Sequence, residues 1–232
     1  MAQEPNQQPA TDILNAQRDQ WQQNFSSRPG MFGYVPSFPA GFAAELFRTE
    51  RKNRILELGG GQGRDSLYFA RSGFDLTVVD YSYAGLRETR ENLRVAQVGL
   101  PIQTVCQDVR KPLPFDSGSF DAVYSHMLYC MALTTPEIVA LSDEIRRVLK
   151  PGGLNIFTVR TRQDAHYRTG IHRGEDMYEV GGFIVHFFDR AKVEQVASGY
   201  ELVSLDNFDE GGLPRRLFLV VLRKPAIGAQ AF

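Results

Sequence analysis

The feature that most constrains this fold is a regular alternation, from Arg54 onward, of short apolar runs with segments of helical periodicity. Gly, Pro, Ser or Asp marks each boundary, as expected where a chain turns between elements. Such alternation indicates a parallel sheet with crossover helices, and near-continuous apolar runs are typical of strands buried on both faces. The runs occupy residues 55–58, 76–79, 102–106, 120–124 and 154–159.

The rest of the chain divides around this core. Residues 1–11 are rich in Gln, Pro and Asn and predict a flexible tail. Residues 12–53 combine a helical apolar stripe with a turn-rich aromatic stretch, which predicts a cap segment packed over the sheet. The α/β pattern fills residues 54–225 and closes with a predicted hairpin. Its periodicity lapses over residues 163–186, where we expect a lid-like loop.

Charge and composition limit the classes of molecule that the protein is expected to bind. The 26 basic and 27 acidic residues are spread along the chain, and the net charge of −1 shows no electrostatic footprint for nucleic acid. No apolar run is as long as a membrane helix, and the N-terminus has no signal-peptide pattern. We therefore expect a cytoplasmic protein that acts on a small molecule. Cys106 and Cys130 lack CxxC spacing and are predicted to be buried thiols.

The loop 57–63 joins the first predicted strand to the next helix. Gly59, Gly61 and Gly63 permit positive φ and a close approach of ligand to backbone, and the following helix N-terminus offers unpaired N–H groups. Asp80 ends the second predicted strand, where a carboxylate can accept hydrogen bonds from ribose hydroxyls. We therefore expect a ligand that contains a ribose.

Two observations separate the candidate cofactors. Dinucleotide enzymes use GxGxxG, but the spacing here is GxGxG, and Arg64 and Ser66 stand where a third glycine would be required. Glu57 would place a carboxylate near the phosphates of a dinucleotide, whereas a cofactor with an ammonium and a sulfonium tolerates it. Spacing and charge favour S-adenosylmethionine.

The loop and the segments that follow it resemble the class I S-adenosylmethionine-dependent methyltransferases. ELGGGQG matches the first motif of that family and CQDV the end of its third strand, while FDAVYSHML and LKPGGLNIF resemble the fourth strand and the helix end with the fifth strand. The resemblance spans residues 54–161. It implies a Rossmann-like, doubly wound α/β fold with a mostly parallel seven-stranded sheet in the order 3-2-1-4-5-7-6, the last strand antiparallel.

The resemblance also implies a cofactor site. In that family the Asp of the third motif and the following backbone amide hold the adenine, which here means Asp108 and Val109. The cofactor-binding residues that we expect are Glu57, Gly59, Gly61, Gly63, Asp80, Tyr81, Asp108, Val109 and Ser125.

Acceptor and catalytic residues are expected after the fourth and fifth strands. A sulfonium methyl already has a good leaving group, so the enzyme must mainly align a nucleophile, exclude water and, where required, remove a proton. His126 and Arg160 are the candidate catalytic residues, with packing beneath the cofactor and an outward salt bridge as their structural alternatives. The candidate substrate contacts are Tyr34, Met127, Tyr129, Arg162 and His186. The spacing of the histidines matches no zinc pattern, and we expect no metal.

The N-terminal aromatic residues leave two interpretations open. The residues Trp21, Phe25, Phe32, Tyr34 and Phe38 can close over the sulfonium as a lid or simply pack, and Trp21 is assigned to packing. The function that we expect is methyl transfer from S-adenosylmethionine to a small molecule. An RNA or protein methyltransferase and a non-catalytic S-adenosylmethionine-binding protein are the alternatives.

Overall fold

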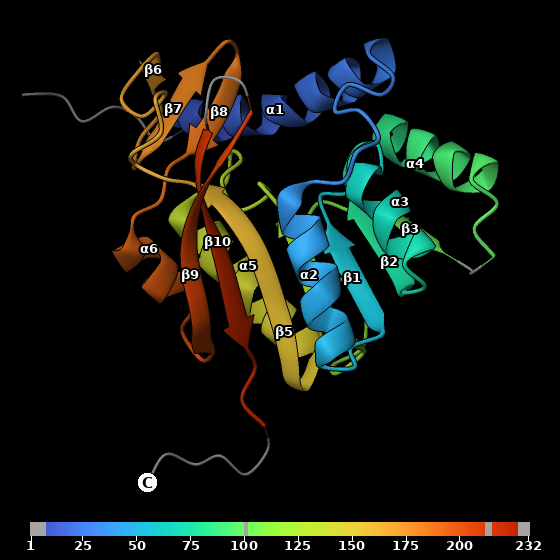
Figure 1. Ribbon diagram of the computed structural model, residues 1–232. Helices are drawn as coiled ribbons and strands as arrows, with labels where there is room; N and C mark the ends of the chain where they lie inside the picture. Colours follow the sequence, from blue (N-terminus) through green and yellow to red (C-terminus); the bar gives the residue numbers. More distant parts are fainter. Residues whose placement is uncertain (1–7, 100–101, 212–214, 227–232) are drawn as a thin grey trace, which may run out of the picture.

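A seven-stranded sheet forms the centre of the computed structural model, which describes residues 8–99, 102–211 and 215–226 (Figure 1). The strand order is β3-β2-β1-β4-β5-β10-β9; β10 runs antiparallel to both of its neighbours, and β1 to β5 are parallel. This confirms the predicted fold and strand order, with β9 and β10 as the sixth and seventh strands. The strands are β1 (Arg54–Leu58), β2 (Asp75–Asp80), β3 (Gln103–Cys106), β4 (Phe120–His126), β5 (Leu149–Arg160), β9 (Glu201–Glu210) and β10 (Arg215–Arg223).

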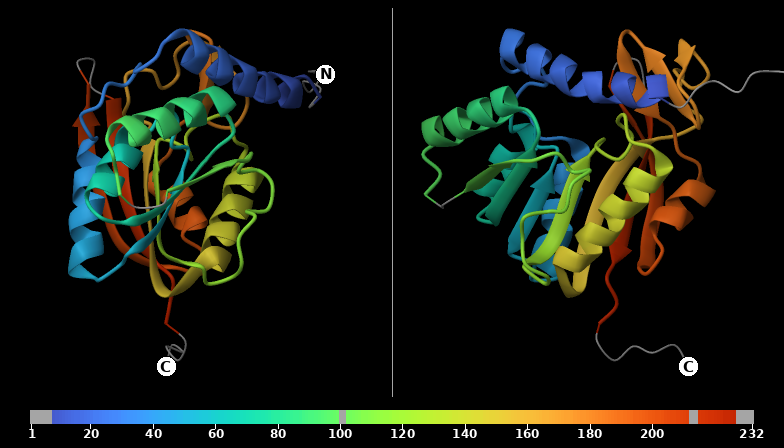
Figure 2. Two further views of the ribbon diagram at one scale, coloured as in Figure 1. Left: turned by 90° about the vertical axis from the view of Figure 1, so that its right-hand side faces the viewer. Right: turned by 180° about the vertical axis from the view of Figure 1, so that it is seen from behind.

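Helices cover both faces of the sheet. On one face lie α2 (Phe38–Thr49), α3 (Arg64–Arg71) and α4 (Tyr83–Val95), and on the other lie α5 (Thr135–Val148) and α6 (Arg190–Val196). Figure 1 is seen from the α2 side, and the right-hand view of Figure 2 shows the α5 side. Neighbouring residues of β1 alternate between the two cores, because successive side chains of a strand point to opposite faces: Ile55 packs with α2 and α3, and Leu56 with α5.

The helix α1 (Gln8–Ser27) lies across the end of the sheet to which the parallel strands point (Figures 1 and 2). Residues 8–11, predicted as part of a flexible tail, belong to this helix, and residues 1–7 lie outside the described residues. Because the apolar stripe of the helix packs on the domain, its first turn is helical despite a polar sequence.

The segment predicted as a loop over 163–186 contains a small antiparallel sheet. Its strands are β6 (Ile171–His172), β7 (Met177–Val180) and β8 (Phe183–His186), in that order. Gly181 and Gly182 join β7 to β8 as a two-residue turn, with φ of 59° and 82°, the positive values that such a hairpin turn requires. Strands of two to four residues are too short for a readable periodicity, which is why the sequence indicated only a loop.

One strand departs from the prediction of burial on both faces. The third strand, β3, is the outermost strand of the sheet, and its four residues are exposed or half-buried. Cys106 is therefore exposed, which corrects the prediction of a buried thiol, whereas Cys130 is buried as predicted. In the described part of the chain, no helix is long and apolar enough to cross a membrane.

Candidate functional site

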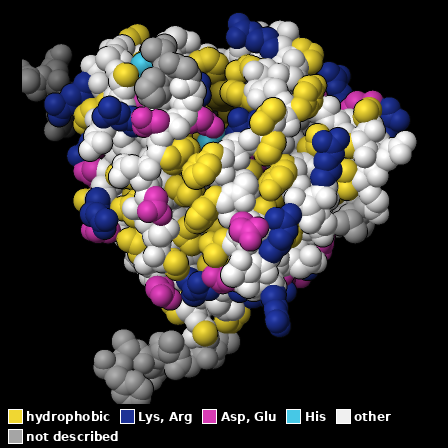
Figure 3. All heavy atoms as spheres, viewed as in Figure 1, with side chains coloured by type: hydrophobic (Ala, Val, Ile, Leu, Met, Phe, Trp, Pro, Cys, Tyr) yellow, Lys and Arg dark blue, Asp and Glu magenta, His cyan; other side chains and the backbone are white. Residues whose placement is uncertain are grey.

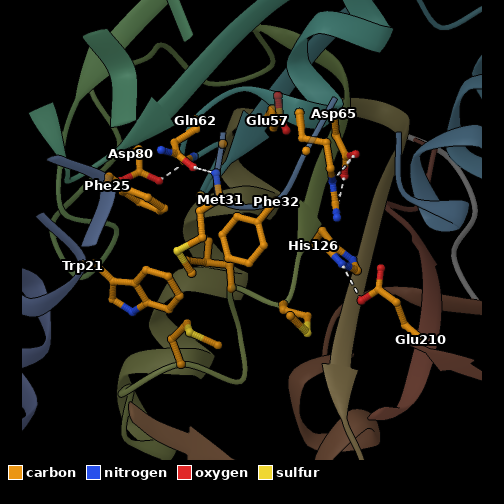
Figure 4. Close-up of a pocket in the computed structure, with 18 of the residues that line it drawn as sticks. Trp21, Phe25, Met31, Phe32, Glu57, Gln62, Asp65, Asp80, His126 and Glu210 are labelled. Atoms are coloured by element: carbon orange, nitrogen blue, oxygen red, sulfur yellow. Dashed lines mark hydrogen bonds and ion pairs between the residues drawn. The ribbon is translucent and has the colours of Figure 1, made fainter. Parts of the chain in front are cut away.

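A cavity of about 430 Å³ lies at the carboxyl ends of β1, β2 and β4, beneath α1 (Figure 4). The strand order reverses between β1 and β4, and open α/β sheets bind ligands at this switch point. The volume falls in the usual range for small-molecule sites. The lining residues are Trp21, Phe25, Met31, Phe32, Gly33, Glu57, Gly59, Gly60, Gly61, Gln62, Arg64, Asp65, Asp80, Tyr81, His126, Met127, Leu128, Met131, Glu210, Gly211 and Arg215.

The glycine loop and Asp80 form one wall of the cavity. Gly61 has a φ of 54°, and its N–H donates to Asp80 Oδ2 at 2.8 Å, while the N–H of Ser82 donates to Oδ1 at 2.7 Å. Burial raises the pKa of Asp80, although these N–H groups act in the opposite direction. The carboxylate therefore holds the loop in place and still has oxygen lone pairs available to a ligand.

Glu57 lies behind the same loop and is buried. Its Oε2 accepts a hydrogen bond from the Ser66 hydroxyl at 2.5 Å. Burial, with a smaller contribution from the Asp65 charge, raises the pKa of Glu57 to about 8, against the opposing effects of Ser66 and Arg64. At neutral pH the group is thus mostly protonated, and a cation beside it would favour the ionised form.

Asp65 lies in the first turn of α3 and forms a second acidic centre in the wall. It accepts hydrogen bonds from the N–H of Ser37 at 2.8 Å, the hydroxyl of Ser37 at 2.7 Å and the hydroxyl of Tyr124 at 3.0 Å, and Arg64 Nε lies 3.1 Å away. Burial opposes ionisation, but the Arg64 charge, His126 and the Ser37 hydrogen bonds lower the pKa of Asp65. Asp65 belongs to none of the sequence motifs that point to the site, so only its position in the fold reveals it.

His126 lies at the end of β4 with both ring nitrogens in polar contacts. Nδ1 is 2.9 Å from the Thr158 hydroxyl oxygen, and Nε2 is 3.3 Å from Glu210 Oε2 (Figure 4). The next residue, Met127, has a φ of 57°, which is rare for a residue with a side chain and is held here by its N–H donating to Thr158 Oγ1 at 2.9 Å. Backbone strain of this kind clusters at functional sites.

Aromatic side chains form the roof. Trp21 lies with its ring centroid 5.3 Å from Phe25 and 6.3 Å from Phe32, and all three line the cavity (Figure 4). The Trp21 ring also lies 4.8 Å from Phe183 of β8. The packing interpretation and the lid interpretation of Trp21 are thus compatible, because one ring packs on β8 and faces the cavity.

Two glutamine side chains fix α1 on opposite sides of the cavity. Gln22 Oε1 accepts from the hydroxyl of Ser82 at 2.8 Å and from the N–H of Ala84 at 3.1 Å, at the start of α4. Gln17 donates to the carbonyl of Gly182 and accepts from the N–H of Ile184, each at 3.0 Å, on the small sheet. The roof is therefore attached at both ends by specific polar contacts.

The structure brings part of the predicted site together. The predicted residues that line the cavity are Glu57, Gly59, Gly61, Asp80, Tyr81, His126 and Met127. The predicted residues that lie elsewhere are Tyr34, Gly63, Asp108, Val109, Ser125, Tyr129, Arg160, Arg162 and His186. Gly63 precedes α3 and packs against Thr89, and Tyr129 is a core residue stacked on Phe157 at 4.3 Å.

Two of these outlying residues bear on the predicted cofactor site. The Asp108 carboxylate accepts from Arg110 Nη2 at 2.7 Å, and this hydrogen bond helps to lower the pKa of Asp108 although burial opposes it. Ser125 Oγ is buried with no hydrogen-bond partner in the described part of the chain. The adenine contact of Asp108 therefore stays a prediction, in competition with Arg110.

Arg160, which ends β5, and Arg162 belong to a separate polar network outside the cavity. Arg160 is buried, and its guanidinium is paired with Asp164 and lies 3.0 Å from His166 Nδ1. Arg162 pairs with Asp176 at 2.6 Å. His186 is also buried there, with Nδ1 2.7 Å from the carbonyl of Leu133. These side chains have internal partners and do not line the cavity.

The face of the domain that carries α2 has an apolar patch. Hydrophobic side chains gather over α2 and the neighbouring part of β9, and the surface is hollowed above them (Figure 3). Phe38 of α2 is 65% exposed, and its ring centroid is 5.6 Å from that of Phe208 on β9. Tyr34, a predicted substrate contact, is 58% exposed and stands outside the cavity.

The wall residues fit S-adenosylmethionine by their chemistry. Asp80 offers carboxylate oxygens to ribose hydroxyls, Glu57 can ionise beside a cation, and the rings of Trp21, Phe25 and Phe32 suit a sulfonium. A metal site has no such support: among the described residues, no group of three His, Cys, Asp or Glu side chains could hold an ion.

Comparison with known sequences identifies the segment that carries the glycine loop. Residues 55–153 match a family described as a methyltransferase domain. The putative methyltransferase YqeM of Bacillus subtilis (strain 168) is 34% identical over 114 residues, 47% of this chain and 43% of the relative. Methyltransferase phqN of Penicillium fellutanum is 27% identical over 187 residues, 76% and 54% of the two chains. The chain spans about half the length of these relatives.

Solved structures share the fold over most of the chain. A SAM-dependent methyltransferase of Methanosarcina mazei has a TM-score of 0.68 at 18% identity, covering 86% of this chain and 98% of that one. The 1,6-didemethyltoxoflavin-N1-methyltransferase of Burkholderia thailandensis has a TM-score of 0.71 at 15% identity, covering 97% and 93%. Residues 55–153 thus match a methyltransferase domain, and the fold of the chain is that of solved S-adenosylmethionine-dependent methyltransferases.

Proposed function

We propose that this protein transfers a methyl group from S-adenosylmethionine to a small-molecule acceptor. The observation that carries the proposal is the cavity itself, in which Asp80, Glu57 and an aromatic roof meet at the switch point of the sheet. The match of residues 55–153 to a methyltransferase domain supports the reaction type. When bound, S-adenosylmethionine supplies a methyl group on a positively charged sulfur, which is a good leaving group.

The residues of the chain then have positioning roles. Asp80 orients the ribose and holds the glycine loop through Gly61. Glu57 balances positive charge within the enclosed wall. The roof residues Trp21 and Phe32 exclude water, so that the acceptor meets the methyl group in a fixed and dry geometry. Such alignment is the main contribution that a methyl transfer from a sulfonium requires.

Three observations favour a small acceptor. The cavity lies under a helix that is attached on both sides by Gln17 and Gln22, which limits the access of a polymer. Charges along the chain are balanced and provide no basic tract for nucleic acid. The toxoflavin-precursor methyltransferase, whose fold is similar, was solved with its small-molecule acceptor bound.

Calorimetry and an acceptor screen test the proposal together. We expect the purified protein to bind S-adenosylmethionine and to release S-adenosylhomocysteine with members of a small-molecule panel. The same assay is run with total RNA and with a protein extract as acceptors. Release with RNA or protein alone would favour a macromolecular substrate. Binding without release from any acceptor would favour a non-catalytic protein, and no binding at all would overturn the proposal.

A further inference from the structure

The cavity has a second end that the cofactor residues do not use. Asp80 and the glycine loop lie at one end of the close-up, and His126 and Glu210 lie at the other (Figure 4). Glu210 ends β9, so it reaches the cavity from the strand hairpin at the far edge of the sheet rather than from any methyltransferase motif. An acceptor bound at this end would lie beside the residues expected to hold the cofactor.

A chain of hydrogen bonds connects this pair to the backbone. The N–H of Met127 donates to Thr158 Oγ1 at 2.9 Å, and the same oxygen lies 2.9 Å from His126 Nδ1. A carboxylate can only accept, so His126 Nε2 carries a proton and donates it to Glu210 Oε2 at 3.3 Å. Both nitrogens of His126 are thus engaged, and Glu210 is the group left to contact an acceptor.

The charge of Glu210 follows from its neighbours. Burial opposes ionisation, but the hydrogen bond and charge of His126, together with Arg64 and Arg215, lower the pKa of Glu210. Arg64 is itself paired with Asp65 at 3.1 Å, and Arg215 Nη1 lies 4.0 Å from Glu210 Oε2 with 43% of its side chain exposed. At neutral pH the carboxylate is therefore ionised, and it attracts hydrogen-bond donors and repels anions.

We infer that Glu210 binds the methyl acceptor, and that the acceptor is a neutral nitrogen compound with an N–H group. This inference rests on the proposed methyl transfer. The N–H donates to Glu210, which orients the nitrogen lone pair; His126 acts through Glu210 and is a positioning residue. A thiolate or phenolate would instead place a second negative charge beside the carboxylate, and a neutral hydroxyl would have to give its proton to a carboxylate that the lowered pKa makes a weak base.

The transfer balances in charge and atoms. The nitrogen lone pair forms the new bond to the methyl carbon, and the electron pair of the carbon–sulfur bond stays on sulfur, which becomes a neutral thioether. Positive charge therefore passes from sulfur to nitrogen, where the ionised Glu210 stabilises it. The N–H proton then leaves to Glu210 and from there to water, which yields the neutral methylated amine.

The test pairs two amide substitutions with matched acceptors. Glu210→Gln removes the charge but keeps the shape, and Asp209→Asn makes the same chemical change at the preceding residue, which is exposed and does not line the cavity. The probes are aniline, phenol and thiophenol. A second set of larger ring compounds carries the same amine, hydroxyl and thiol groups. We expect methylation of the amines, a loss of about 100-fold in kcat/KM in Glu210→Gln, and a change below about 2-fold in Asp209→Asn.

Preferred methylation of hydroxyl or thiol members, or equal rates in the two variants, would overturn the inference. So would the absence of any methylated amine. Calorimetry separates this failure from that of the proposed function: S-adenosylmethionine binding should be the same in both variants and the wild type. If the wild type binds no S-adenosylmethionine or methylates no acceptor of any class, the proposed function and the inference fall together.

Nitrogen NMR of His126 gives a readout besides turnover. Aniline added to the protein saturated with S-adenosylhomocysteine should shift the Nε2 resonance through the shared carboxylate, and phenol should shift it less. In Glu210→Gln the aniline-induced shift should disappear while the melting temperature stays within a few degrees of the wild type. A shift of equal size in this variant would show that the acceptor does not contact Glu210.

Discussion

Glu57 accepts a hydrogen bond from the hydroxyl of Ser66 at 2.5 Å, in a position where only 3% of the Glu57 residue is exposed. The contact joins the end of the strand β1 to the first turn of the helix α3 behind the glycine loop. It does not compensate for burial, which raises the pKa of Glu57 from 4.5 to about 8. Because the pKa of this carboxyl group is higher in the folded protein than in the unfolded chain, the stability of the protein depends on pH.

The first prediction concerns Glu57→Gln. Between pH 4.5 and about 8 the folded protein holds a proton on Glu57 that the unfolded chain releases, so this group makes stability fall as the pH rises through that window. The fall amounts to at most about 5 kcal/mol, at about 1.4 kcal/mol per pKa unit. Urea unfolding at pH 5, 6, 7 and 8 should show a steeper decline for the wild type than for Glu57→Gln. Parallel profiles would show that Glu57 is not protonated in the folded state.

The second prediction concerns Asp80. Asp80→Asn keeps the size of the side chain but removes the charged acceptor, and we expect affinity for S-adenosylhomocysteine to fall about 10-fold to 100-fold. Asp75→Asn, at the opposite end of β2 with a side chain 52% exposed, is the matched control and should bind as the wild type does. Calorimetry measures both, and equal affinities would remove Asp80 from the cofactor site.

The third prediction uses Trp21, the single tryptophan of the chain. Because its ring lines the cavity and contacts Phe183, its fluorescence should change in intensity or wavelength as S-adenosylhomocysteine binds. Trp21→Ala should weaken binding about 10-fold, and Trp21→Phe less, since an aromatic face remains. An emission spectrum that stays constant at saturating ligand would place the roof away from the bound cofactor.

The fourth prediction compares two glycines. A Cβ at Gly60 would meet Val78 Cγ1 at 2.3 Å in the buried loop, so Gly60→Ala should destabilise the protein by about 2 kcal/mol. Gly41 lies within α2 with open space around it, and Gly41→Ala should stabilise by up to about 1 kcal/mol. Denaturant unfolding gives both values. If Gly60→Ala leaves the free energy of unfolding unchanged, Val78 of β2 moves aside more easily than its packing indicates.

Local patterns were sufficient for the sheet and for one wall of the site. Strands buried on both faces read as apolar runs, and residues that directly follow parallel strands meet at one edge, so Glu57, Asp80 and His126 could be assigned to one crevice. Asp108 shows the limit of this reasoning. Its motif is present, but Arg110 two residues later supplies a partner that no family pattern describes.

The opposite end of the cavity could not be predicted from local patterns, because it is formed by contacts between distant parts of the chain. Glu210 contacts His126 across 84 residues of sequence, and Gln17 contacts Ile184 across 167 residues. Local periodicity cannot predict either pair. The sequence by itself determined the doubly wound sheet, the glycine loop and its acidic partner, because these depend on short-range pattern. Only the tertiary structure decided which arginines turn inward, that α1 closes the cavity and that Glu210 faces it. Side chains with the same local sequence pattern can be buried or exposed, and packing against distant parts of the chain selects between the two.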